Sequence, residues 1–211
     1  MLRFLVVLLG CILLPLSTHA YSIGKTNGTS GQVLRWHTSN IGYYIYTSGS
    51  ADVLDGSDLA AVQNGFQQWS SIGCSSLNVS YMGTTNNKYN MASGADTNGK
   101  NEVGWAEGSE WKYGAYVLGL TQTSFSPESG EISEADIAFN GYQNKWSTNG
   151  KSGTTDILNV ASHEEGHFVG AQHVLGGYSS SNPPTMAPKA DPYLKSQTLE
   201  ADDKLLACYL Y

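Results

Sequence analysis

The chain has 211 residues, of which 40% are hydrophobic and 14% are charged, a composition typical of one globular domain with a sizeable core. Eleven Lys and Arg residues stand against 18 Asp and Glu residues, so the formal net charge is −7. Because an acidic chain has little attraction for phosphate groups, we expect no nucleic acid partner and no binding to an anionic membrane surface.

The first twenty residues differ in composition from the rest of the chain. Arg3 precedes an apolar run over residues 4–14, which is too short to span a bilayer and is followed by small residues. This pattern predicts a cleaved secretory signal peptide over residues 1–20, and hence a secreted, extracellular protein with one domain over residues 21–211. The alternatives are an N-terminal anchor and lipidation at Cys11, although the apolar run continues past that cysteine, where a lipidation motif ends.

The next part of the chain carries strand signals and then helix signals. Residues 21–31 are rich in Gly, Ser, Thr and Asn and predict a loose arm, whereas β-branched and aromatic residues predict a first strand over 33–46. A helix follows, for which Ser57 can serve as the cap. Its apolar residues recur on one face with helical spacing, and these are Leu59, Val62, Phe66 and Trp69.

Later segments predict short strands first and helices last. The expected strands, separated by a polar loop and by Gly and Pro turns, are 77–82, 102–105, 115–121 and 132–139. Helices are expected over 156–169 and 199–210, and the last carries acidic residues in its first turn, where the helix dipole favours them. This order of elements predicts an α+β fold.

Three of the five histidines of the chain, His163, His167 and His173, lie within eleven residues. On a helix the first two are separated by about 400° of rotation and about 6 Å of rise, so both imidazoles project from one face. Gly170 can take the left-handed conformation that ends a helix and turns the chain, which lets His173 join them. Three nitrogen ligands leave the fourth tetrahedral position of a zinc ion open to water, as in catalytic zinc sites.

Two glutamates follow the first of these histidines. Glu164 lies about 100° further round the helix than His163, near enough to accept a proton from a water on the metal but turned away from coordinating it. Glu164 is therefore the candidate catalytic base, whereas Glu165 is interpreted as a solvent-facing residue of the helix. The alternative, a histidine cluster on a solvated helix face, is disfavoured because the five fixed positions of the motif arise by chance in roughly one such chain in 10⁵.

Residues 163–173 match the zinc signature HExxHxxGxxH of the metzincin metalloproteases. Met186, thirteen residues after the third histidine, stands where these proteins carry a methionine turn beneath the metal. The run 156–162 and the closing helix make the chain, over residues 33–211, most similar to the matrixins within this clan. Val174 departs from the pattern, since matrixins usually have serine there.

The resemblance implies a metzincin-like (zincin) catalytic domain of the α+β class, with a twisted mixed sheet, three helices and a small C-terminal subdomain. It also implies a secreted zinc-dependent endopeptidase, whose protein or peptide substrate pairs with an edge strand at 115–121 beside a cleft. Two other classes stay open: a zinc-bearing binding module without turnover, which the intact Glu164 disfavours, and a zinc hydrolase acting on a non-peptide bond. We expect a monomer.

The sequence also bears on whether the protein holds a second zinc or a calcium ion, and on whether it needs proteolytic activation. Matrixins hold a second, structural zinc on other histidines. Once His19 is removed with the predicted signal peptide, His37 alone remains outside the motif and predicts an ordinary strand residue, so we expect one catalytic Zn²⁺. Calcium is possible but not predicted: one acidic turn could supply oxygen ligands, but a solvated surface is the favoured interpretation, since no spaced loop of such ligands is evident. That turn contains Glu128, Glu131, Glu134 and Asp136. No cysteine in residues 21–32 can cap the metal, so we expect activity without proteolytic activation.

Two cysteines, Cys74 and Cys208, remain after removal of the predicted signal peptide. In an exported protein they allow one internal pairing, and we expect a disulfide that ties the end of the first helix to the end of the last. The alternative is a pair of separate buried thiols.

Overall fold

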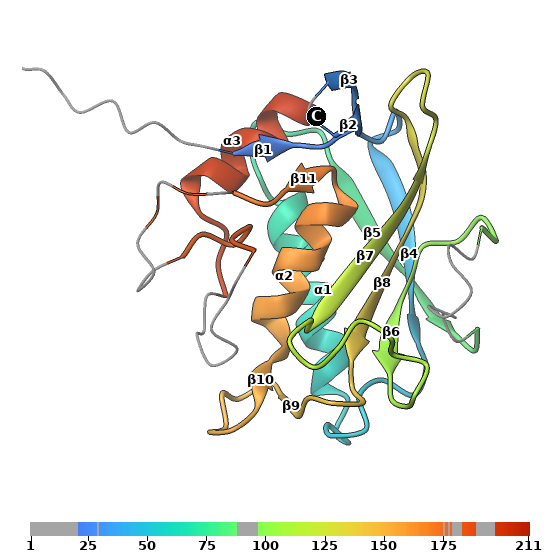
Figure 1. Cartoon of the computed structure of the whole chain (residues 1–211), viewed down its shortest axis with the longest axis vertical. Coiled ribbons are helices and arrows are strands. Elements are labelled where there is room, and N and C mark those ends of the chain that lie inside the picture. Colours follow the sequence, from blue (N-terminus) through green and yellow to red (C-terminus); the bar gives the residue numbers. More distant parts are fainter. Residues whose placement is uncertain are drawn as a thin grey trace, which may run out of the picture.

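The protein is described by a computed structural model, which covers residues 21–28, 30–87, 97–174, 176, 178, 183–188 and 197–211. The predicted signal peptide over residues 1–20 lies outside this part of the chain. Within the described ranges, none of the helices combines the length and the hydropathy that a bilayer span requires. The described residues form an α+β architecture, with a mixed sheet and three helices (Figure 1).

The main sheet has five strands in the order β5-β4-β6-β8-β7. Four of them are mutually parallel: β4 (Asn40–Tyr46), β5 (Asn78–Thr85), β6 (Glu102–Ala106) and β8 (Ile132–Asn140). The fifth, β7 (Gly119–Phe125), runs antiparallel to β8 and forms one edge of the sheet. Its outer side therefore has backbone groups that no strand of the sheet pairs, which is the geometry that an added extended segment requires.

Three pairs of short strands lie outside this sheet. They are β1 (Ser22–Ile23) with β11 (Ala171–Gln172), β2 (Lys25–Asn27) with β3 (Ser30–Val33), and β9 (Trp146–Ser147) with β10 (Thr155–Asp156). The first pair joins the N-terminal part of the domain to the segment that immediately precedes His173.

Two helices, α1 (Ser57–Ser70) and α2 (Ile157–Phe168), lie side by side against one face of the sheet (Figure 1). Ser57 is not the cap of α1, as the sequence suggested. That position is taken by Gly56, whose φ of 78° is left-handed, and Ser57 is the first helical residue. The cap of α2 is Asp156, whose carboxylate accepts the backbone N–H of Asn159 at 2.9 Å and so satisfies one free donor of the first turn.

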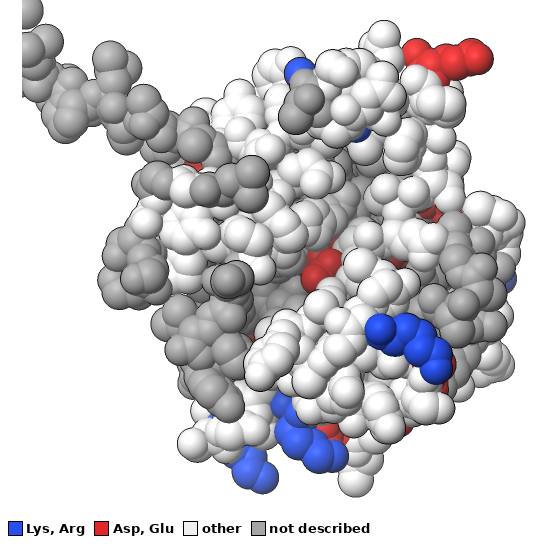
Figure 2. Space-filling model, in the orientation of Figure 1, with Lys and Arg blue, Asp and Glu red and all other residues white. Residues whose placement is uncertain are grey.

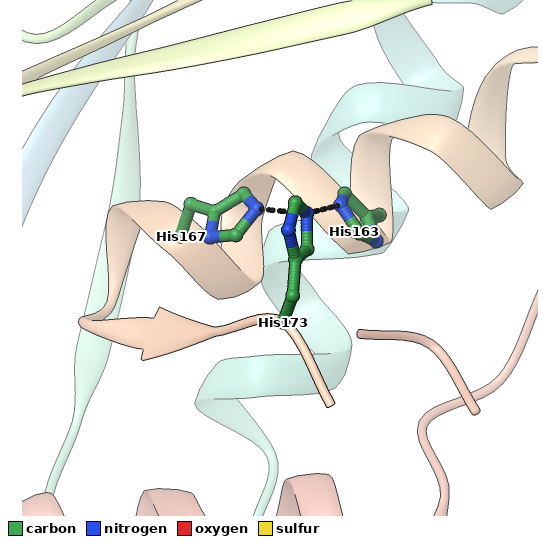
Figure 3. A group of neighbouring side chains, drawn as sticks. All are labelled: His163, His167 and His173. Carbon is green, nitrogen blue, oxygen red and sulfur yellow. Dashed lines mark hydrogen bonds between the residues drawn. The ribbon is translucent and has the colours of Figure 1, made fainter. Parts of the chain in front are cut away.

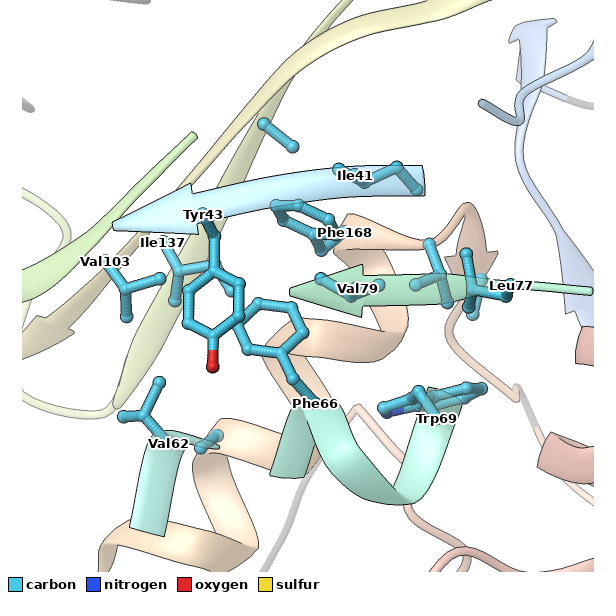
Figure 4. Close-up of a cluster of buried hydrophobic side chains, with 14 of the residues drawn as sticks. Ile41, Tyr43, Val62, Phe66, Trp69, Leu77, Val79, Val103, Ile137 and Phe168 are labelled. Carbon is cyan, nitrogen blue, oxygen red and sulfur yellow. The ribbon is translucent and has the colours of Figure 1, made fainter. Parts of the chain in front are cut away.

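The hydrophobic core fills the space between the sheet and these two helices (Figure 4). The Phe66 ring of α1 lies 4.1 Å, centroid to centroid, from Tyr43 of β4 and 5.0 Å from Phe168 of α2. The indole N–H of Trp69 donates to the carbonyl of Ser162 at 3.0 Å and links the two helices directly. Because such close packing tolerates little displacement, the core fixes the position of α2 relative to the sheet.

The last helix, α3 (Ala201–Leu210), secures the end of α2. Cys208 of α3 forms a disulfide with Cys74, which follows α1, and their Cα atoms lie 5.2 Å apart. The hydroxyl of Tyr211 donates to the carbonyl of Val169 at 2.8 Å, and the indole of Trp36 donates to that of Phe168 at 2.9 Å. These donors satisfy carbonyls that the end of a helix leaves without partners inside the helix.

The predicted strand over 33–46 is wrong in its extent. β3 ends at Val33 and β4 begins at Asn40, because Arg35 between them pairs with the distant Glu131 as an isolated bridge. His37 is therefore not a strand residue. It lies in an exposed bend, with its Nδ1 3.6 Å from Oε2 of Glu131.

The arm over 21–31 is not loose in the structure. It contributes β1, β2 and the start of β3, and Gly24 donates its N–H to the carbonyl of Gly170 at 3.0 Å. Backbone pairing of this kind places few demands on side chains, so the composition of the arm gave no sign of it.

The strand expected at 115–121 forms the edge of the sheet, but it begins at Gly119. Side-chain amides hold the residues before it outside the strand: Asn140 donates to the carbonyl of Val117 at 3.0 Å and Asn144 to that of Ala115 at 3.1 Å.

Candidate metal centre

Helix α2 carries two of the three histidines of the motif. His163 and His167 are separated by one turn and are half-buried, whereas almost all other residues of this helix are buried. A helix that is apolar or buried around most of its circumference lies inside a domain, and near its C-terminal end only the side with the two imidazoles is partly exposed. The packing of α2 therefore determines which way these two side chains point.

The third histidine reaches the same place through a chain reversal at Gly170. Its φ of 99° is left-handed, and its N–H donates to the carbonyl of His167 at 3.0 Å. A Cβ at this position would also meet the carbonyl oxygen of Leu34, so the turn has room for glycine alone. β11 then leads the chain back along α2 to His173, as the sequence predicted.

The three imidazoles converge through their Nε2 atoms (Figure 3). The Nε2 of His173 lies 3.2 Å from that of His163 and 3.1 Å from that of His167. In a tetrahedral zinc site with Zn–N bonds of about 2.0–2.1 Å, ligand nitrogens lie about 3.3 Å apart, so the observed spacing fits that ion. These histidines are the group of potential metal ligands that the described residues bring together at this spacing.

Backbone carbonyls orient two of the rings. The Nδ1 of His163 lies 2.6 Å from the carbonyl oxygen of Thr185, and the Nδ1 of His167 lies 2.9 Å from that of Ala171. A carbonyl can only accept, so Nδ1 carries the proton in each ring and the Nε2 lone pair faces the point of convergence. In metal sites, a histidine ligand is usually oriented in this way, by a hydrogen bond from the ring nitrogen that does not bind the metal.

Burial also keeps these rings in the ligand form. The pKa of His163 is lowered to about 3 by burial and by the neighbouring His167, although the bond to Thr185 opposes the shift. The pKa of His173 is lowered to about 4 by burial and then by His167. Both imidazoles are thus neutral at pH 7, with a lone pair free for a metal ion.

Glu164 is buried beside the cluster, with its carboxylate turned towards β7. The hydroxyl of Thr121 donates to its Oε2 at 2.7 Å. Burial raises the pKa of Glu164, while His167 and the bond from Thr121 act in the opposite direction. Sequence reasoning did not single out Thr121, because its role depends on a contact between residues 43 positions apart. The space-filling view shows a hollow on the face that carries α2 and β7, with acidic atoms visible inside it (Figure 2).

The prediction for Glu165 is wrong. The sequence favours a solvent-facing position, yet the side chain is fully buried between α2 and α1, with its carboxyl group against the backbone of Gly65. Neither carboxyl oxygen has a hydrogen-bond partner within the described residues. Burial raises the pKa of this group well above its ordinary value, and Glu164 adds to the shift. The prediction failed because it assumed an exposed outer face for α2, which the packing of α1 covers.

Met186 lies directly beneath α2. Its side chain is buried, and its sulfur occupies the place that a Cβ at residue 166 would take, so Gly166 leaves room for it. The carbonyl of Met186 accepts the N–H of Val174 at 2.9 Å, which ties this turn to the residue after His173. Val174 itself is buried in the core. Met186 thus packs against the same helix that carries His163 and His167.

The acidic turn is not simply a solvated surface. Glu128 and Glu131 are exposed, but Glu134 and Asp136 are buried. Glu134 accepts the N–H groups of Asn98 and Gly99, and Asp136 accepts that of Glu102 at 2.8 Å. These two carboxylates bind backbone donors, a use that the local sequence did not reveal.

The fold and the site together define a candidate metal centre of three histidines beside a buried carboxylate, on a helix that lies against a mixed sheet. No family model matches the chain. The chain is 28% identical over 160 residues to karilysin from Tannerella forsythia, an alignment that covers 74% of this chain and 31% of karilysin. The chain thus spans about a third of the length of this relative, and the similarity is distant.

Proposed function

We propose that the protein is a secreted zinc-dependent endopeptidase of matrixin-like metzincin architecture. The observation that carries this proposal is the convergence of three Nε2 atoms at zinc-ligand spacing, with the carboxylate of Glu164 on the adjacent residue of the same helix. Distant similarity to karilysin, a metalloprotease, supports the same class of activity.

In the proposed mechanism His163, His167 and His173 bind one zinc ion. When bound, zinc supplies a Lewis acid and lowers the pKa of its water towards about 7. Glu164 accepts a proton from the attacking water and returns it to the departing amine of the cleaved peptide bond. Met186 takes no part in proton transfer and forms an apolar floor under the imidazoles.

The substrate is proposed to be an extended stretch of protein or peptide. β7 ends the strand order of the sheet within the described residues, so its outer side offers backbone groups to which such a segment can add as a further strand. Residue Thr121 of this edge contacts Glu164, so a peptide paired with β7 would pass close to the proposed base.

Casein cleavage by the purified protein tests this function. We expect cleavage that a chelator abolishes and added zinc restores. The Glu164→Ala variant should retain zinc and lose most turnover, whereas His167→Ala should lose the metal. Glu128→Ala, which removes an exposed glutamate, is the matched control. Hydrolysis of ester but not peptide substrates would favour a non-peptide hydrolase, and zinc binding without hydrolysis of either would indicate a binding module. Near-parental cleavage by a zinc-loaded Glu164→Ala variant would overturn the role of Glu164.

Export is proposed from residues 1–20 and is supported by the Cys74–Cys208 disulfide, which suits an oxidising compartment. Sequencing the N-terminus of the exported protein tests this. We expect it to begin at Tyr21, and a chain that keeps residues 1–20 would contradict the assignment.

A further inference from the structure

The residues of strand β7 point alternately towards α2 and towards the other face of the sheet. Leu120 points away from α2 and packs against Ala106, Trp111 and Ala138. Gly119 and Thr121, on either side of it, both lie against the Glu164 carboxylate. Because alternate residues of a β-strand face the same side of the sheet, Gly119 and Thr121 both face the side chain of Glu164.

The hydroxyl of Thr121 lies within hydrogen-bond distance of two oxygens of the same residue. It is 2.7 Å from Oε2 of Glu164 and 2.9 Å from its main-chain oxygen. A threonine hydroxyl has one proton to donate, and each of its two acceptors here belongs to Glu164. Whichever of these two oxygens accepts the proton, the hydrogen bond joins Glu164 to β7.

Gly119 has no side chain, and this leaves space for the other carboxylate oxygen. A Cβ at this position would lie 2.6 Å from Oε1 of Glu164 and 2.8 Å from its Cγ, closer than real Cβ atoms approach. The backbone of Gly119 does not have the positive φ that only glycine readily adopts. Space for Glu164, rather than backbone freedom, explains glycine here.

We propose that Thr121 and Gly119 are positioning residues for Glu164: the hydroxyl holds one oxygen of the carboxylate, and the glycine leaves room for the other. The proposal rests on the proposed function only in taking Glu164 as the general base. A buried carboxylate with rotatable bonds needs such support, because a catalytic group must be held close to its productive geometry. The edge that would bind the substrate backbone then also orients the base.

Thr121→Val removes the hydroxyl and keeps the shape, and kinetics with a peptide substrate form the first test. We expect kcat to fall about tenfold, which corresponds to about 1.4 kcal/mol in the transition state, with KM within about twofold of the parent. Thr121→Ser should recover most of the lost kcat. Gly119→Ala should also lower kcat. Thr84→Val, the same substitution at an exposed position of β5 on the opposite edge of the sheet, is the matched control, and zinc content is measured in each variant.

A second test needs no activity. The melting temperature of the metal-free protein is measured for Thr121→Val in the parent and in the Glu164→Ala background. If the hydroxyl acts through Glu164, the decrease in the parent is at least halved when Glu164 is absent. An equal decrease in both backgrounds, or a kcat for Thr121→Val equal to that of Thr84→Val, overturns the proposal. A parent that cleaves no peptide refutes the proposed function alone, and the melting temperatures then decide whether the contact exists.

Discussion

At the scale of single residues, a buried carboxyl group faces a glycine on the neighbouring helix. Glu165 of α2 lies against Gly65 of α1, and a Cβ on Gly65 would collide with the carboxyl oxygens. Burying an ionisable group without a hydrogen-bond partner costs free energy, and the cost is greater when the group is charged. The pairing of Glu165 with Gly65 therefore makes the stability of the fold depend on pH.

Replacing Glu165 by Gln is predicted to stabilise the protein at neutral and alkaline pH. The folded state raises the pKa of Glu165, so above the ordinary value of 4.5 it retains a proton that the unfolded chain releases. The contribution of this group to the free energy of unfolding is therefore fully present below pH 4.5, and it is lost as the pH rises through the raised pKa. Melting temperatures of the chelator-treated protein between pH 4 and 9 measure the effect.

In that experiment the Glu165→Gln variant should lose less stability with rising pH than the parent. The same substitution at the exposed Glu128 is the control. A Glu165→Gln protein whose melting temperature falls in parallel with the parent would show that this carboxyl is not responsible.

Gly166 presents the opposite case, a glycine that is needed inside a helix. Alanine normally stabilises a helix interior by about 1 kcal/mol relative to glycine. Here its Cβ would overlap the sulfur of Met186 and approach Trp69, so Gly166→Ala is predicted to destabilise the fold by about 1–3 kcal/mol. Chemical unfolding measures this, with Gly73→Ala as the control because no atom lies near a Cβ there. A stabilised Gly166→Ala variant would mean that Met186 moves aside without cost.

At the scale of elements, α3 is held to the rest of the domain by the Cys74–Cys208 disulfide, which spans 134 residues of sequence. Replacing both cysteines by Ser is predicted to lower the free energy of unfolding by about 2–5 kcal/mol, since a long loop is no longer closed in the unfolded chain. Denaturant unfolding measures this, with and without a reductant. If reductant leaves the parent unchanged while mass spectrometry shows two free thiols, the disulfide does not form.

Local sequence predicted the elements whose signals are themselves local. The spacing of His163 and His167 on one helix, and Gly170 as the residue that turns the chain, require knowledge of only a few neighbouring positions. The edge position of β7 was expected from the resemblance, with an error in its start. The burial of Glu165, the pairing of β1 with β11 and the bond from Thr121 to Glu164 each depend on segments far apart in the chain. No periodic pattern reports such contacts, so the sequence could not predict them.

At the scale of the whole molecule, the prediction concerns metal content. We expect one zinc ion per chain by elemental analysis, because the three histidines of the cluster converge and His37 is exposed elsewhere, beside Glu131. Because zinc should bind the folded protein and not the unfolded chain, added zinc should raise the melting temperature and a chelator should lower it. Two tightly bound zinc ions in the purified protein would contradict the expectation, and His37→Ala would then test whether His37 holds the second.

The order in which the chain is made bears on when the metal centre can exist. β1 pairs with the strand just before His173, Arg35 donates to the carbonyl of Leu210 at 3.2 Å, and Cys74 bonds to Cys208. A chain that emerges N-terminus first can make none of these contacts until most of it has been synthesised, because each joins an early residue to a late one. The segment that carries His173 can therefore take its place in the fold only late in synthesis, and we expect the proposed metal centre to form late as well.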